Sequence, residues 1–84
     1  MRVIFTKPFR RQYKHLPANL KHKCDERIAE FLKGGNKALL NDHKLAGEYA
    51  GCRSINITGD FRAIYYRDAD VSYFIAVGTH SQLY

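Results

Sequence analysis

The sequence contains no apolar stretch long enough to cross a bilayer, which takes about 20 consecutive apolar residues. Its first segment, MRVIFTKPFR, also lacks the apolar core of a signal peptide, because Lys7, Pro8 and Arg10 interrupt it. These two absences argue against a membrane-spanning or secreted protein. We therefore expect a cytoplasmic protein with no membrane partner.

Cysteine is scarce, since Cys24 and Cys52 are the only two and have no metal-ligand spacing. A disulfide between them is not expected in a reducing compartment. The Walker loop and the motifs GxSxG, CxxC and HExxH are all missing as well. We therefore expect neither a metal site nor any other cofactor.

Acidic residues are few in the first half of the chain, and the charge is uneven. Residues 1–44 hold eleven Lys and Arg against four acids, whereas residues 45–84 hold three against four. A positive field of this kind favours a polyanionic partner such as RNA, DNA or the ribosome. The alternative is a merely solvated helical face, and charge alone does not separate the two.

The 84 residues suffice for one domain with one modest core, and we assign residues 1–84 to it. Helical periodicity follows Pro8, is interrupted at Pro17 and stops at Gly34. Apolar and alternating runs before and after this region are typical of strands. The expected elements are a strand at Arg2–Phe5, one helix on each side of Pro17, and strands at Cys52–Thr58, Phe61–Arg67 and Val71–Val77.

This β-α-α-β-β-β order predicts a small α+β fold in which a helix hairpin packs on an antiparallel sheet. The last three strands form a meander, with a tight turn and a permissive φ at Gly59. The pattern does not fix where the first strand joins the sheet. The segment Asn36–Gly51 has no convincing period beyond a short turn at Ala38–Leu40, and long loops of this kind are often functional.

Two of the four histidines stand apart from the basic helices: His43 lies in the long loop and His80 follows the last strand. Loop and strand ends can meet at one edge of a small sheet. Arg62 lies mid-strand among apolar residues, so it either forms an ion pair or lines a polar concavity that receives an anion. A base, an acid and a cation are what metal-free RNA cleavage requires. A binding module with scattered histidines fits these residues almost as well.

The segment DHKLAGEYAGCRSINITGDFRAIYY, followed by VGTHSQLY, resembles the RelE/ParE superfamily of toxins from type II toxin–antitoxin systems. Within it, the YafQ-like branch of ribosome-dependent mRNA interferases is the most similar, and the resemblance covers nearly the whole chain. It implies two helices on an antiparallel sheet and cleavage of mRNA in the ribosomal A site by the 2′-hydroxyl. It also implies a cognate antitoxin, with which the chain would form a hetero-oligomer.

The same resemblance implies roles for individual residues. His80 and its partner His43 would act as acid and base with help from Asp60, Arg62 would clamp the phosphate, and Tyr84 would position RNA as an aromatic edge. We accordingly predict His43, Asp60, Arg62, His80 and Tyr84 as the catalytic set.

RNA contacts are predicted for Arg53, Asn56 and Phe61 near the site, and ribosomal RNA contacts for Lys21, Lys23 and Arg27 on the helices. Asn56 stands where YafQ-like enzymes usually carry a histidine, and asparagine cannot transfer a proton near neutral pH. For three residues a purely structural role is the alternative to a functional one. Arg53 could form an ion pair with Asp60, Phe61 could belong to the core, and Tyr84 could be frayed at the terminus.

Two other functions stay open at this point. One is a ParE-like toxin that acts by binding, for example to DNA gyrase, without nuclease chemistry. The other is a catalytically weakened toxin retained for its complex with antitoxin. The trio of His43, Asp60 and His80 favours the nuclease, whereas Asn56 keeps the weakened toxin open.

Overall fold

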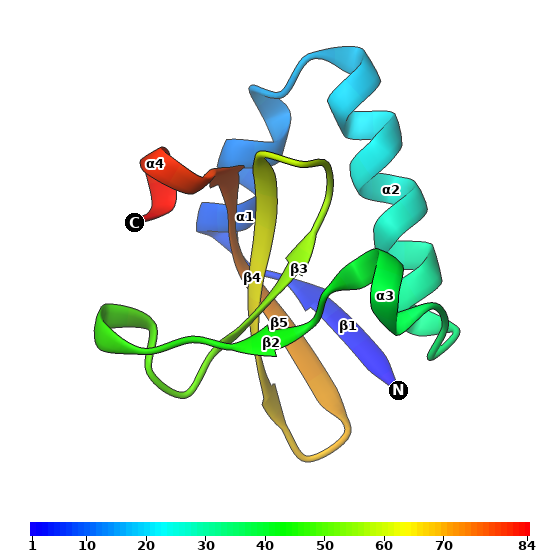
Figure 1. Ribbon diagram of the computed structural model, residues 1–84, viewed down its shortest axis with the longest axis vertical. Helices are drawn as coiled ribbons and strands as arrows, with labels where there is room; N and C mark the ends of the chain where they lie inside the picture. Colours follow the sequence, from blue (N-terminus) through cyan, green and yellow to red (C-terminus); the bar gives the residue numbers. More distant parts are fainter.

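The computed structural model describes residues 1–84 and folds them into a five-stranded sheet with helices around it (Figure 1). In Figure 1, α1 lies behind the sheet and α2 runs alongside it. The elements are β1 (Arg2–Phe5), α1 (Lys7–Lys14), α2 (Ala18–Leu32), α3 (Lys37–Leu40), β2 (His43–Lys44), the 3₁₀ turn η1 (Gly47–Tyr49), β3 (Arg53–Asn56), β4 (Phe61–Asp68), β5 (Val71–Thr79) and α4 (His80–Leu83).

The sheet has the order β1-β5-β4-β3-β2, and it is mixed, not antiparallel throughout. The expected meander of β3, β4 and β5 is confirmed, but β1 joins it parallel to β5, from Arg2 opposite Val71 to Phe5 opposite Phe74. Parallel neighbours need a long crossover between them, and the helices and the rest of the chain supply it. The α+β class is therefore confirmed, and the position of the first strand is now fixed.

Both long helices form where the sequence predicts them. Pro8 lies in the first turn of α1, and Pro17 precedes the first residue of α2. Proline suits these positions because the first N–H groups of a helix have no partner inside it. After α2, Gly34 takes a positive φ of 68°, which ends the helix as expected. None of the helices is long and apolar enough to cross a bilayer.

The core lies between the two long helices and one face of the sheet. The buried stripe of α2 includes Cys24 and Phe31, and α1 contributes Phe9. Phe74 of β5 is fully buried and contacts the rings of Phe9, Phe31 and Tyr65 at centroid distances of 5.8, 5.4 and 5.1 Å. Burial raises the pKa of the Cys24 thiol to about 12, as is expected of an apolar packing residue.

The segment Asn36–Gly51 is not the irregular loop that the sequence predicts. The Asn36 side chain accepts a hydrogen bond from Leu39 N (3.0 Å) and caps α3, and β2 then pairs with β3. The two residues of β2 are too few to show a strand pattern in the sequence. Their extended structure follows from pairing with β3. Gly59, where we expected a turn with a permissive φ, does not adopt a positive φ, whereas Ala69 in the next hairpin does.

Candidate active site

The sheet face away from the long helices carries three of the predicted polar site residues. Asn56 and Arg62 lie directly opposite each other on β3 and β4, and Arg62 also lies opposite Gly78 on β5. His43 of β2 lies opposite Ser54, two residues before Asn56. Residues two apart on a strand share a face, and so do cross-strand partners. His43, Asn56 and Arg62 therefore lie on one face, which we call the outer face.

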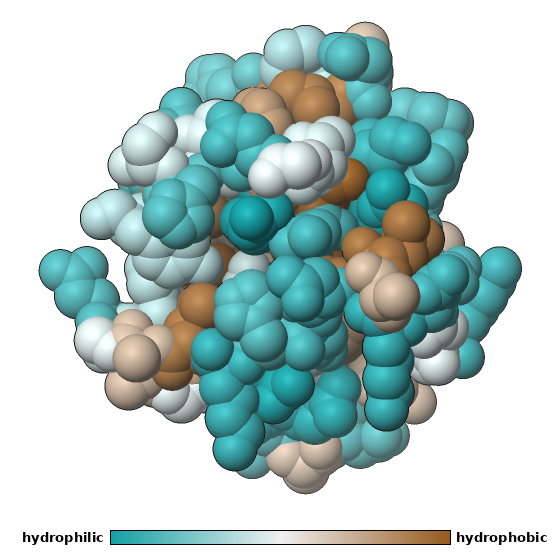
Figure 2. Space-filling view, viewed as in Figure 1, coloured by the Kyte–Doolittle hydropathy of each residue, from teal (hydrophilic) through white to brown (hydrophobic).

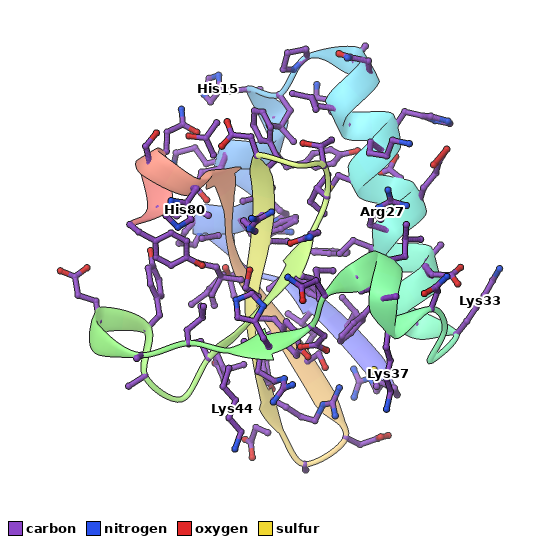
Figure 3. All side chains as sticks on the ribbon, in the orientation of Figure 1. His15, Arg27, Lys33, Lys37, Lys44 and His80 are labelled. Carbon is purple, nitrogen blue, oxygen red and sulfur yellow. The ribbon has the colours of Figure 1, made fainter.

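The outer face is opposite the packed core, because the intervening residues Ile55 and Ala63 are buried against the helices. Figure 2, which has the same orientation as Figure 1, shows that this side of the molecule is mostly hydrophilic, with scattered hydrophobic areas. Basic side chains flank it: Figure 3 shows Lys33, Lys37 and Lys44 along its right and lower margins, on or next to α2, α3 and β2. A polyanion that lies on this face would therefore meet cations at its rim.

Arg62 is half-buried and forms no ion pair. Its Nη1 donates to the carbonyl oxygens of Thr58 and Gly59, both at 3.3 Å. These neutral acceptors orient the guanidinium without cancelling its charge. Of the two alternatives drawn from the sequence, the ion pair is excluded, and a guanidinium that can receive an anion remains.

His80 is exposed at the first turn of α4, beside the upper part of the sheet in Figure 3. Its main-chain N–H donates to the Asp60 carbonyl oxygen at 3.1 Å, which ties α4 to the tip of the β3–β4 hairpin. Its ring packs on Tyr84 (centroids 4.7 Å apart), and Tyr84 also meets Tyr49 edge-on at 5.7 Å. The terminal tyrosine is thus packed between two rings, although about half of it (51%) is exposed.

His43 is exposed on the edge strand β2, and its Nδ1 lies 2.7 Å from the carbonyl oxygen of Asn41. A carbonyl oxygen accepts only, so Nδ1 carries the proton and Nε2 is left free to accept one. The sequence leaves open whether His43 and His80 lie close together. His43 lies on β2 and His80 directly follows β5, and these two strands are not neighbours in the sheet. Two strands separate β2 from β5, which puts these strands roughly 14 Å apart. A substrate would have to span the distance between them.

Arg53 forms an ion pair with Asp42 (Nε to Oδ1, 2.8 Å), and so Asp60 is not its partner. The second carboxylate oxygen of Asp42 accepts the Tyr65 hydroxyl at 2.6 Å. The hydrogen bond to Asp42 raises the pKa of Arg53, and burial together with that carboxylate raises the pKa of Tyr65. Sequence reasoning missed Asp42 and Tyr65; the only signal was an acid directly before His43.

The remaining predicted residues have mixed surroundings. Phe61 packs against the core cluster, which favours the core interpretation, and the Asp60 side chain is exposed at the hairpin tip. Asn56 is half-buried, and its Oδ1 has no hydrogen-bond partner.

The three predicted cations of α2 also differ from one another. Lys21 lies over the Tyr13 ring at 5.9 Å, and Lys23 lies 3.7 Å from Glu26. Arg27 donates to the Ile57 carbonyl oxygen at 3.2 Å and so braces α2 on the hairpin. Figure 3 shows Arg27 on the side of the molecule away from His80. Arg27 therefore has a structural contact, whereas Lys21 and Lys23 keep their charges at the surface.

The solved structures that are similar to this chain include bacterial toxins. YafQ from E. coli strain BL21(DE3) superposes with a TM-score of 0.80 at 21% identity, covering 100% of this chain and 99% of that one. YafQ in the E. coli DinJ–YafQ complex gives 0.78 at 22% identity over 100% and 99% of the two chains. A chain of the toxin–antitoxin complex RelBE2 from Mycobacterium tuberculosis gives 0.66 at 25% identity, over 94% and 96%.

No curated protein sequence matches the chain significantly. A family model does, over residues 1–84, and its description is "Bacterial toxin of type II toxin-antitoxin system, YafQ". This match spans every element of the outer face, from His43 on β2 to Tyr84 at the end of α4. The chain therefore belongs to the YafQ family of toxins of bacterial type II toxin–antitoxin systems.

Proposed function

We propose that this toxin is a ribosome-dependent endoribonuclease, which cuts translated mRNA by attack of a 2′-hydroxyl on the adjacent phosphate. The observation that carries the proposal is Arg62: a half-buried guanidinium with no ion-pair partner, held by two carbonyl oxygens on the face that bears His43. Such a cation suits the charge that develops on a phosphate under attack.

The order of the strands supports a division of labour between the two histidines. The attacking 2′-oxygen and the leaving 5′-oxygen lie on opposite sides of the phosphorus, so a base and an acid must approach from opposite sides. His43 on β2 and His80 after β5 flank the strand that carries Arg62. In this proposal Nε2 of His43 takes the 2′-hydroxyl proton, Arg62 holds the phosphate, and protonated His80 gives its proton to the 5′-oxygen.

Other residues have supporting roles in the proposal. Asp60 assists the two histidines from the hairpin tip, to which the His80 main chain is bonded. Tyr84 holds the His80 ring by packing against it, and Asn56 contacts the RNA beside Arg62. Because Asn56 cannot replace a proton-transferring histidine, the work of base and acid falls on His43 and His80 alone.

The proposed partners are the bacterial ribosome with mRNA in its A site, in the cytoplasm, and a cognate antitoxin. The basic first half of the chain supports a ribosomal RNA contact. Clustered lysine and arginine release counterions from the phosphates of the RNA, and this release favours binding. The antitoxin is proposed from the related YafQ, which was crystallised with DinJ.

The test is controlled induction in a bacterial host of the wild type, His80→Ala and a matched surface variant, His15→Ala. The 5′ ends of cellular mRNA are mapped and translation is assayed. Codon-linked cuts with wild type and His15→Ala, but not with His80→Ala, are expected. Growth arrest with DNA damage and no cuts would instead indicate a gyrase-binding toxin, and no toxicity would indicate a weakened one.

A further inference from the structure

The carboxylate of Asp42 joins three separate parts of the chain directly before the predicted base. It accepts Arg53 Nε from the start of β3 at 2.8 Å and the Tyr65 hydroxyl from β4 at 2.6 Å. Arg53 Nη2 also approaches the main-chain oxygen of Asp42 at 3.5 Å. Asp42 is partly buried in this arrangement, with 24% of its side chain exposed. The residue before His43 is therefore held by two residues on two strands, Arg53 of β3 and Tyr65 of β4.

The residue before Asp42 is held just as closely. Asn41 adopts the left-handed conformation (φ 45°, ψ 48°), and its N–H donates to the Lys37 carbonyl oxygen at 2.8 Å. Its own carbonyl oxygen is thereby aimed at Nδ1 of His43, 2.7 Å away. Asparagine is one of the few residue types that adopt this conformation readily, so Asn41 itself favours the turn that its N–H bond to Lys37 closes.

The β2 strand itself is short, and the Leu45 N–H bond to the Cys52 carbonyl oxygen at 3.0 Å extends its attachment to the chain before β3. It has only two residues, lies at the sheet edge, and pairs with β3 through His43–Ser54 and Lys44–Arg53. Both of its side chains are exposed, and apolar packing reaches only the flanking residues Leu40 and Leu45. Arg53 is at once the main-chain strand partner of Lys44 and the side-chain ion-pair partner of Asp42, so it links the Asp42 carboxylate to the strand on which β2 pairs.

We infer that Asp42, held by Arg53 and Tyr65, is a positioning residue that fixes the Asn41 carbonyl and thereby keeps His43 in the tautomer protonated on Nδ1. The base of the reaction needs Nε2 unprotonated and facing the substrate, and a carbonyl that accepts from Nδ1–H secures this. The catalytic meaning of the inference rests on the proposed function. The tautomer itself does not, because it is a property of the free protein.

The experiment is 15N nuclear magnetic resonance of the full-length toxin at a pH where His43 is neutral, because long-range nitrogen–proton couplings distinguish the two tautomers. Wild type is expected to show one His43 tautomer, with the proton on Nδ1. Asp42→Asn is expected to show a mixture. The matched control is Asp25→Asn, since Asp25 also accepts a tyrosine hydroxyl (Tyr13, 2.7 Å) but lies on α2. The control is expected to leave His43 unchanged.

If Asp42→Asn does not fold, Tyr65→Phe removes only the hydroxyl and is expected to shift the tautomer ratio in the same direction. A wild-type His43 protonated on Nε2 would overturn the inference. So would a folded Asp42→Asn or Tyr65→Phe whose ratio equals that of wild type.

Cleavage of mRNA on programmed ribosomes adds a second readout. Asp42→Asn is expected to lower kcat about 10- to 100-fold with KM nearly unchanged. A general base contributes about 10²- to 10⁴-fold to the rate, and the variant is expected to lose part of this contribution. An unchanged kcat would overturn the positioning role. If wild type does not cut mRNA at all while the tautomer result holds, the proposed function fails and the inference about His43 stands.

Discussion

The main-chain N–H of His80 donates to the main-chain carbonyl oxygen of Asp60 at 3.1 Å. The position of His80 thus depends on the backbone of the hairpin tip and not on the Asp60 side chain. Since both side chains are exposed, either one can be replaced without opening the core. This separation allows the chemistry of each residue to be tested without a loss of stability.

For His80 we predict that replacement by alanine lowers the single-turnover rate of mRNA cleavage about 10²- to 10⁴-fold, the usual contribution of a proton donor. The midpoint of thermal unfolding should stay within about 2 °C, since exposed surface substitutions change stability little. Asp60→Asn, which keeps the backbone hydrogen bond, should fold equally well and show a smaller loss of rate. If Asp60→Asn lost as much as His80→Ala, the supporting role of Asp60 would be contradicted, because its carboxylate would be as essential as His80.

For Arg62 we predict that replacement by lysine does not preserve mRNA cleavage. The guanidinium donates to Thr58 and Gly59 through one nitrogen and keeps other N–H groups for the phosphate, whereas an ammonium lacks this fork geometry. Loss of one such electrostatic contact typically costs about 10²- to 10³-fold in kcat. Ribosome affinity, measured by sedimentation, should be nearly unchanged. If Arg62→Lys cut mRNA as fast as wild type, the proposal that the Arg62 guanidinium holds the phosphate would be contradicted.

Gln12 of α1 covers the part of the β5 edge that β1 leaves unpaired, because its Oε1 accepts from Val77 N at 2.9 Å. Gln12→Ala should lower the free energy of unfolding by about 1–3 kcal/mol, the cost of leaving a buried donor without a partner. Gln12→Glu retains an acceptor and should lose less. Urea unfolding of the three proteins measures both effects, and equal midpoints for alanine and wild type would show that this bond contributes nothing.

The ribosome contact is best tested with Lys21→Gln/Lys23→Gln, leaving Arg27 intact because it braces α2 on Ile57. Weaker ribosome binding is expected, with the slope of log affinity against log salt reduced by roughly 0.7–0.9 per lost phosphate contact. Arg2→Gln/Arg67→Gln lowers the net charge equally at the far end of the sheet and serves as the control. If the two double variants weaken ribosome binding equally, only the net charge matters, and the proposed contact between α2 and ribosomal RNA is refuted.

The helices and the meander could be predicted from sequence because their signals are local. Pro8, Pro17 and Gly34 mark the helix ends, and the alternation of Ile55 and Ile57 with polar residues marks a strand. The parallel place of β1 could not be predicted, since it depends on pairing with residues at the other end of the chain. The strand β2 could not be predicted either, because His43 and Lys44 form it only against Ser54 and Arg53.

The sequence proposes individual residues for the candidate site but not their arrangement. The motifs single out His43, Arg62 and His80, yet only the strand order shows that Arg62 lies between the two histidines. The Asp42 contacts to Arg53 and Tyr65 were missed because they join residues 11 and 23 positions apart, a separation that no local pattern encodes.

The central claim is that the nucleophile is the 2′-hydroxyl of the mRNA. The most direct measurement places a single 2′-deoxynucleotide on the 5′ side of the cut, in mRNA bound in the ribosomal A site. The account predicts that cleavage at this bond is lost, while an all-ribose mRNA is cut and ends in a 2′,3′-cyclic phosphate. Cleavage of the deoxy-substituted bond at the wild-type rate would contradict it, because another nucleophile would then have attacked.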